Sequence, residues 1–162
     1  MPSPLPLASA WLYARPEALL VLAQHVTTDG IVLAGLPAWR LPADVSPEEL
    51  GAALEGALAG ARRGVPTPAR DDYSAALRPV REALGYASWS ALEHRSRACD
   101  VLRMPTDEYV FVPQRNNGSR GAHRGFRPVP NARLALAGPL TRAALGAAAL
   151  QSVRLSEVAP GA

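Results

Sequence analysis

The fold class is decided by residues 18–33, which read ALLVLAQHVTTDGIVL. Two apolar runs, 18–25 and 30–33, flank the tripeptide Thr28-Asp29-Gly30. Asp-Gly accommodates the positive φ angles of tight hairpin turns, so the stretch predicts two antiparallel strands. Strands and helices then come in blocks rather than in strict βαβ alternation, and this order favours an α+β domain.

Further strands are expected on both sides of this hairpin. Short apolar or alternating runs predict them over 11–14, 37–42, 101–104, 109–112 and 133–137. The run 37–42 has proline at both ends, which indicates an edge strand. Residues 105–108, Pro-Thr-Asp-Glu, form a turn between two of the runs.

The strongest helix signal is Ser46-Pro47-Glu48-Glu49. Serine at the N-cap, proline at the first helical position and glutamate at the third form a capping box. Apolar residues then recur at helical spacing, which predicts a helix ending near residues 62–63 with Gly64 as its stop. Three more helices are expected, and they run from Pro79 to Gly85, from Ser88 to about Ala98, and onward from Pro139.

These elements predict one domain with α+β architecture, a mostly antiparallel β-sheet covered by three to four α-helices. We expect this domain over residues 10–155, after a flexible proline-rich segment at 1–9 and before a frayed tail at 156–162. The chain has 162 residues, which suits one domain. With 48% apolar and 19% charged residues it is not expected to be disordered, and no apolar run is long enough for a transmembrane helix.

The charge pattern yields the candidate binding residues. All 17 basic residues are arginine, so lysine chemistry is excluded, and the net charge is +3. From residue 109 to 156 there are seven arginines and no acid, while acids crowd the first part of the chain. Arginine forks suit phosphate or carboxylate, although a solvated Gly- and Asn-rich loop is the alternative for 114–126. The candidates are Glu48, Glu49, Glu55, Asp71 and Asp72 among the acids, and Arg115, Arg120, Arg124 and Arg127 among the arginines.

No catalytic or metal-binding pattern is present in the sequence. His25, His94 and His123 lie far apart, and the nucleophile-elbow, P-loop and dinucleotide-binding motifs are missing. Cys99 is the single cysteine, which excludes an internal disulfide and a cysteine-based metal site, and we expect it to end a helix as a small, partly buried residue. We therefore expect a non-enzyme with no catalytic residues, no metal and no cofactor. The first residues lack the positive region of a signal peptide, so a cytoplasmic location is expected.

Four successive stretches carry a resemblance to a known family. They are the acid-led helix and its exit over 45–66, the segment 84–92, the strand 109–118 closing on 125–129, and the alanine-rich 145–148. In order and spacing the sequence resembles the small immunity proteins of bacterial contact-dependent growth inhibition systems, the CdiI type. It departs from them by replacing lysine throughout and by extra residues in the 114–125 loop.

The resemblance implies a cytoplasmic inhibitor that binds the C-terminal toxin domain of a large secreted exoprotein. Such toxins are frequently nucleases, and the family has no catalytic residues to carry over. No membrane partner and no direct nucleic-acid binding are expected in this case. The residues leave open whether the acidic or the basic region meets the toxin. The alternative function is a nucleic-acid-binding accessory domain that uses the Arg-rich 115–127 loop.

Overall fold

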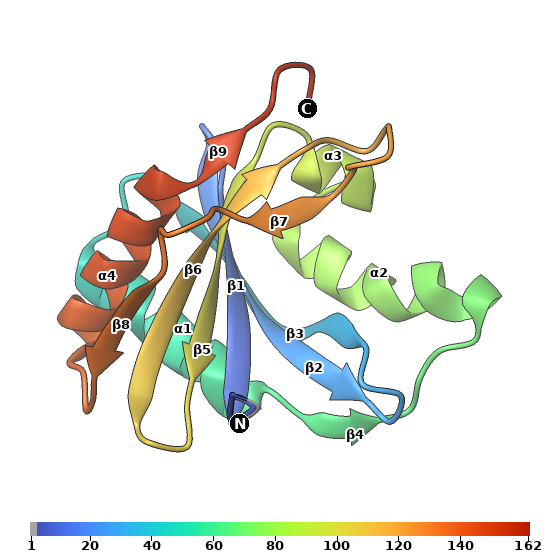
Figure 1. Cartoon of the computed structure of the whole chain (residues 1–162). Coiled ribbons are helices and arrows are strands. Elements are labelled where there is room, and N and C mark those ends of the chain that lie inside the picture. Colours follow the sequence, from blue (N-terminus) through green and yellow to red (C-terminus); the bar gives the residue numbers. More distant parts are fainter. Residues whose placement is uncertain (1–2) are drawn as a thin grey trace.

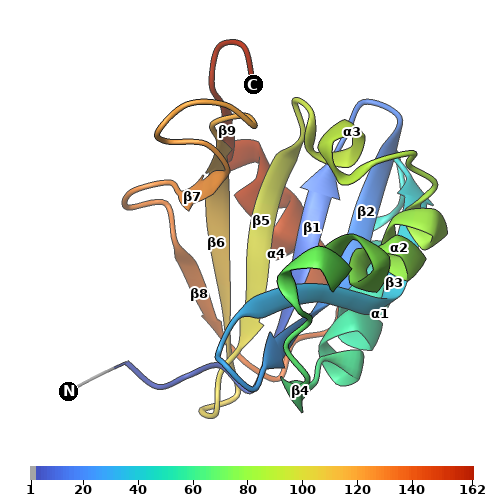
Figure 2. The ribbon, with the colours of Figure 1, turned by 90° about the vertical axis from the view of Figure 1, so that its right-hand side faces the viewer.

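The computed structural model describes residues 3–162 and contains, in that range, four α-helices and one nine-stranded sheet (Figure 1). The expected α+β domain with a mostly antiparallel sheet is confirmed. Helices α1 and α4 lie on one face of the sheet, and α2 and α3 lie on the other (Figures 1 and 2). The sheet is thus sandwiched between two unequal helical layers.

The sheet is built around a central antiparallel path. Its order is β3-β2-β1-β5-β6-β7, with β4 added in parallel to β2, β8 antiparallel to β6, and β9 parallel to β6. The strands are β1 (Ala8–Ala14), β2 (Ala18–Thr27), β3 (Val32–Pro42), β4 (Arg63–Val65), β5 (Arg97–Arg103), β6 (Glu108–Asn116), β7 (Phe126–Pro128), β8 (Leu134–Ala137) and β9 (Glu157–Val158).

The hairpin predicted from residues 18–33 is confirmed. β2 pairs antiparallel with β3, and Gly30 has the positive φ of 78° that the turn requires. Residues 32–33 of the run predicted at 30–33 and the whole run predicted at 37–42 belong to the single strand β3, whereas residues 30–31 lie outside it. This strand lies at one end of the sheet path, as its flanking prolines predicted.

Helix α1 (Pro47–Gly60) begins at the predicted capping box. The Ser46 hydroxyl accepts a hydrogen bond from the Glu49 amide at 3.2 Å, and the Glu49 carboxylate accepts one from the Ser46 amide at 3.3 Å. The helix ends earlier than predicted, because residues 63–65 leave it to pair with β2 as β4. After β4 the chain forms a short 3-10 helix at Arg70–Asp72.

Helix α2 (Tyr73–Leu84) starts well before Pro79, where the sequence placed its beginning. Pro79 lies inside the helix, which costs a backbone hydrogen bond. The helix tolerates it because the opposite face is packed, with Val80 and Leu84 buried against the sheet. Gly85 ends the helix in the left-handed conformation, at a φ of 78°, as predicted.

Helix α3 (Trp89–Glu93) begins at the predicted Ser88 cap but is much shorter than expected. The chain turns at residues 94–96 and enters β5 at Arg97, so Cys99 lies in a strand rather than at a helix end. Cys99 is fully buried, and burial raises the pKa of its thiol to about 12. Such a thiol stays protonated and is a poor nucleophile.

Helix α4 (Arg142–Leu155) is capped by Thr141, just after the predicted opening proline. The sequence suggested a frayed tail at 156–162, whereas this segment carries β9 and hydrogen bonds with Asn116. At the other terminus β1 begins at Ala8, inside the segment 1–9 expected to be flexible. Residues 1 and 2 of that segment lie outside the described range.

Strand alternation creates two cores, one on each face. Leu12, Val21 and Phe111 face α1 and α4, whereas Tyr13, Leu20 and Leu22 face α2 and α3. The α2 and α3 layer buries fewer side chains and leaves part of its sheet face accessible. Among residues 3–162, no helix is long and apolar enough to cross a membrane.

Candidate interaction surface

Two adjoining hollows lie on the side of the sheet that carries α3. The smaller one, about 290 Å³, lies between β1, β2, β3, α2 and α3, and we call it the aromatic hollow. The larger one, about 650 Å³, lies between α3, the β6–β7 loop and the C-terminal residues, and we call it the polar hollow. Glu93 lines both hollows and so stands at their shared wall.

The aromatic hollow is lined by rings from three elements. Trp11 and Tyr13 come from β1, Tyr73 from α2 and Trp89 from α3. The ring centroids of Trp11 and Tyr13 are 4.9 Å apart, and Phe126 of β7 packs edge-on against both. Such edge and tilted contacts fix the orientation of the rings.

Glu93 is the acidic group of this hollow. Its Oε1 accepts a hydrogen bond from Trp89 Nε1 at 2.8 Å and a long one from Tyr13 Oη at 3.5 Å. Within residues 3–162, no hydrogen-bond donor reaches its Oε2. Burial raises the pKa of Glu93, and the two donors counteract the rise only in part.

A second carboxylate lies on the same face of the sheet. The two oxygens of Asp100, on β5, accept hydrogen bonds from the Nε2 atoms of Gln24 and Gln114, each at 3.1 Å. Burial raises the pKa of Asp100 to about 7. Gln24 also lines the aromatic hollow, so the hollow adjoins two acids, neither of which is paired with an arginine within residues 3–162.

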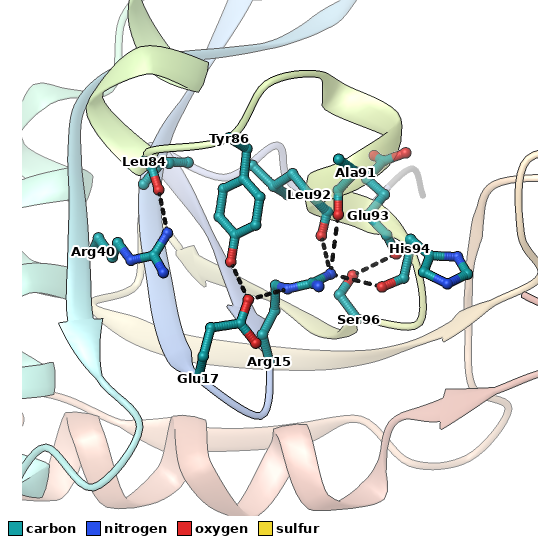
Figure 3. A network of polar contacts seen from close by, with 10 residues as sticks. All are labelled: Arg15, Glu17, Arg40, Leu84, Tyr86, Ala91, Leu92, Glu93, His94 and Ser96. Carbon is teal, nitrogen blue, oxygen red and sulfur yellow. Dashed lines mark hydrogen bonds and ion pairs between the residues drawn. The ribbon is translucent and has the colours of Figure 1, made fainter.

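Arg15 holds α3 in place (Figure 3). Its Nη1 donates to the carbonyl oxygens of Ala91, Leu92 and His94, at 3.2, 2.9 and 2.6 Å. These carbonyls lie at the C-terminal end of α3, where no backbone donor is available to them. The side chain of Arg15 is only 15% exposed, so the cation caps a short helix that would be marginal alone.

The connection between α2 and α3 is fixed by the same network (Figure 3). Glu17 accepts hydrogen bonds from Arg15 Nε at 2.8 Å and from the Tyr86 hydroxyl at 2.7 Å. These donors, Tyr86 first, lower the pKa of Glu17 to about 2. The guanidinium groups of Arg15 and Arg40 lie 5.2 and 5.1 Å from the centre of the Tyr86 ring. The network serves the structure, and it positions the walls of both hollows.

The polar hollow is closed by the tail that the sequence suggested would fray. Ala162 is buried and lies against Gly118, and the Ala159 amide donates to the Asn116 carbonyl. Asn116 in turn donates to the carbonyls of Glu93 and Ser96, at 2.8 and 2.9 Å. His94 and Arg120 also line this hollow.

The four candidate arginines gather near the β6–β7 connection, but they do not behave alike. Arg115 forms an ion pair with Glu157 of β9 at 2.9 Å and is the register partner of Arg127. Arg120, Arg124 and Arg127 are exposed, and no ion pair involves them within residues 3–162. Of the four candidate arginines, three therefore carry no ion pair in the described part of the chain.

The five candidate acids do not form one patch. Glu48 and Glu49 lie in the first turn of α1, where Glu49 completes the capping box. Glu55 pairs with Arg142 of α4 at 3.2 Å, which lowers the pKa of its carboxyl. Asp71 and Asp72 precede α2, on the opposite side of the sheet. Three of these acids thus belong to α1, away from the hollows.

Glu93 and Asp100 were not among the predicted site residues. Apart from Trp89, four residues before Glu93 on α3, the side chains that surround these two acids come from distant strands: Tyr13 from β1, Gln24 from β2 and Gln114 from β6. Residues 3–162 contain no group of three His, Cys, Asp or Glu side chains that could hold a metal ion.

Comparisons with known proteins show a likeness of fold. No family model and no curated protein matches the sequence. Solved structures share its architecture over nearly the whole chain, and one of them comes from a toxin–immunity complex. A protein of unknown function from Neisseria meningitidis is similar with a TM-score of 0.71 and 18% identity, covering 93% of this chain and 95% of its own. A chain of the CdiA-CT/CdiI toxin and immunity complex from Yersinia pseudotuberculosis is similar with a TM-score of 0.69 and 15% identity, covering 93% and 97%. At these identities the likeness shows a shared fold.

Proposed function

We propose that this protein is an immunity protein that binds and neutralises the C-terminal toxin domain of a contact-dependent growth inhibition effector. The observation that carries the proposal is the likeness to a chain of a CdiA-CT/CdiI complex, which covers 93% of this chain and 97% of that one. The four-part sequence resemblance supports it independently of the fold.

We further propose that the toxin domain binds on the side of the two hollows. This side offers concave surface, partly exposed aromatic rings and free arginines together, features that are enriched in protein interfaces. The α1 side offers less, because Glu49 and Glu55 are already engaged within the domain. Arg120, Arg124 and Arg127, together with Asp71 and Asp72 before α2, are the predicted candidates that remain available on the favoured side.

The test is direct binding to the toxin domain encoded next to this protein. The C-terminal domain of the adjacent large exoprotein is purified and titrated into this protein by calorimetry. An immunity pair is expected to bind with a Kd well below about 1 μM, because inhibition must outcompete the toxin's substrate. A Kd above about 1 μM, or toxin activity that is unchanged by saturating protein, would contradict the proposal.

A nucleic-acid-binding domain is the second candidate function, favoured by the three exposed arginines at the β6–β7 end. It predicts an affinity for tRNA or duplex DNA whose logarithm falls linearly with the logarithm of salt concentration. The double variant Arg120→Ser and Arg124→Ser would reduce that slope by roughly two, because two fewer phosphates would be neutralised. A titration at low salt that shows no binding would remove this candidate.

A further inference from the structure

We propose that the aromatic hollow receives the cationic side chain of an arginine or lysine supplied by the toxin domain. The inference rests on the proposed function and names the chemistry by which the partner is recognised. It requires that the hollow be rich in π-faces, negative in charge and free of any cation of its own.

The ring content of the hollow meets the first requirement. Trp11, Tyr13, Tyr73 and Trp89 line it, and Phe126 supports the first two from behind. A cation above aromatic faces is attracted by the ring quadrupole, and tryptophan gives the strongest interaction. The wall is completed by aliphatic side chains that suit the stem of a long basic residue, namely Leu22, Leu33 and Leu77.

The charge of the hollow meets the second requirement. Glu93 lines the cavity and keeps its Oε2 free of donors within residues 3–162. Asp100 lies close behind, hydrogen-bonded to the lining residue Gln24. Burial raises the pKa of both carboxyl groups, which favours their neutral form while no counter-ion is near, and a bound cation would shift both toward the ionised form. A cation in the hollow would supply that counter-ion.

The third requirement is met by the placement of the chain's own arginines. Among the described residues that line this hollow, none is Arg or His. The nearby Arg15 is occupied by the three carbonyls at the end of α3 and by Glu17. A volume of about 290 Å³ lies at the lower limit for small-molecule sites, which favours a single side chain over a larger ligand.

The experiment compares two charge-neutralising variants in calorimetric titrations with the cognate toxin domain. Glu93→Gln keeps an acceptor for Trp89 and removes the charge, and it is expected to raise Kd about tenfold or more. Glu82→Gln is the matched control, because Glu82 is exposed on α2 and lines neither hollow; it should change Kd less than about twofold. Thermal unfolding of each variant verifies that both are folded.

A second measurement uses the wild-type protein alone and does not depend on the toxin. N-acetyl-arginine methylamide is titrated while the indole N–H resonances of Trp11 and Trp89 are followed by NMR, with the uncharged citrulline analogue as control. Selective, saturable shifts with the arginine probe are expected in the millimolar range, the weak affinity typical of one side chain.

The outcomes separate the two proposals. If wild-type protein binds the toxin domain but Glu93→Gln binds equally well, the cation site is wrong and the immunity function stands. Equal shifts with the arginine and citrulline probes would also overturn the cation site. If wild-type protein does not bind the toxin domain, the proposed function fails, and the toxin-borne occupant fails with it.

Discussion

His25 shows how a single residue depends on its surroundings. Its imidazole lies over Gly35, where a Cβ atom would come within 2.1 Å of the ring, and its Nδ1 accepts a hydrogen bond from the Arg62 amide at 3.1 Å. The acceptor role requires an unprotonated Nδ1. Burial, followed by the charge of Arg62, lowers the pKa of His25 below 6.5.

The lowered pKa of His25 predicts a loss of stability in acid. Because the folded state resists protonation, the stabilisation is present above the unfolded pKa near 6.5 and is lost as pH falls through the folded pKa. The free energy of unfolding is measured in urea from about pH 8 to about pH 5 in wild type and in His25→Asn, and the wild-type value should decrease relative to that of His25→Asn as the pH falls. The raised pKa of Asp100, which stabilises the folded state in acid, acts on both proteins alike and cancels in this difference. The control His123→Asn, in an exposed loop, should follow wild type. An NMR titration giving His25 a pKa of 6.5 or above would contradict the prediction.

At the scale of elements, the contact between α1 and α4 depends on two glycines. A Cβ on Gly51 would lie 1.8 Å from the Arg142 carbonyl oxygen, and one on Gly146 would lie 1.8 Å from the Pro47 carbonyl oxygen. The two helices therefore approach backbone to backbone. Only residues with a small side chain, or with none, fit where the two helices come this close, which explains why both helices are rich in alanine.

Gly51→Ala is expected to destabilise the protein although alanine favours helix formation. The intrinsic gain of about 1 kcal/mol is outweighed, because the helices must separate and the packing loss is roughly 1–3 kcal/mol or more. Ala143→Ser, on the exposed side of α4, should change the free energy of unfolding by less than about 1 kcal/mol. A Gly51→Ala protein that is more stable than wild type would contradict this prediction, since it would mean that α1 and α4 can separate at little cost in packing.

The same elements show what could be predicted from sequence. The Ser46 box and the Asp29-Gly30 turn are local chemistry, and both were predicted correctly. The start of α2 was missed because a packed face outweighs the cost of Pro79. The end of α3 was missed because Arg15 and Asn116, distant in sequence, supply the donors that satisfy its carbonyls.

The candidate site was less predictable than the fold. Arg120, Arg124 and Arg127 could be named as candidates because a run of one charge sign is visible in the sequence, and their role stays a prediction. Glu93 and Asp100 were not selected, because their burial and their contacts with Tyr13 of β1, Gln24 of β2 and Gln114 of β6 arise only when these strands come together. The acids that the charge pattern pointed to have mostly structural positions: Glu48 and Glu49 lie in the first turn of α1, and Glu55 forms a surface ion pair with Arg142.

At the scale of the whole molecule, the net charge of +3 conceals an uneven field. The β6–β7 loop, which carries Arg120 and Arg124, lies beside α3 (Figure 1). The β5–β6 turn lies at the opposite end of the molecule. Arg120 of the β6–β7 loop lines the polar hollow, and so does Glu93. A partner meeting this side would therefore need both acidic and basic groups.

The arginine loop is expected to act mainly on the rate of association. The double variant Arg120→Ser and Arg124→Ser should slow toxin binding several-fold at low salt and less at high salt, since rim charges steer encounter. Its free energy of unfolding should stay within about 0.5 kcal/mol of wild type, because both side chains are exposed. Stopped-flow kinetics at two salt concentrations would measure the effect, and an unchanged rate would place the loop outside the interface.

Because tryptophans lie on both faces of the sheet, tryptophan fluorescence can report on each face. Trp39 packs on the α1 side, where its ring borders Gly56, whereas Trp11 and Trp89 line the aromatic hollow. With three tryptophans in the sequence, a Trp39→Phe protein would emit only from the α2 and α3 side. The tryptophan fluorescence of this variant would report occupation of the aromatic hollow. In the wild-type protein, the additional emission of Trp39 would report unfolding of the α1 and α4 layer.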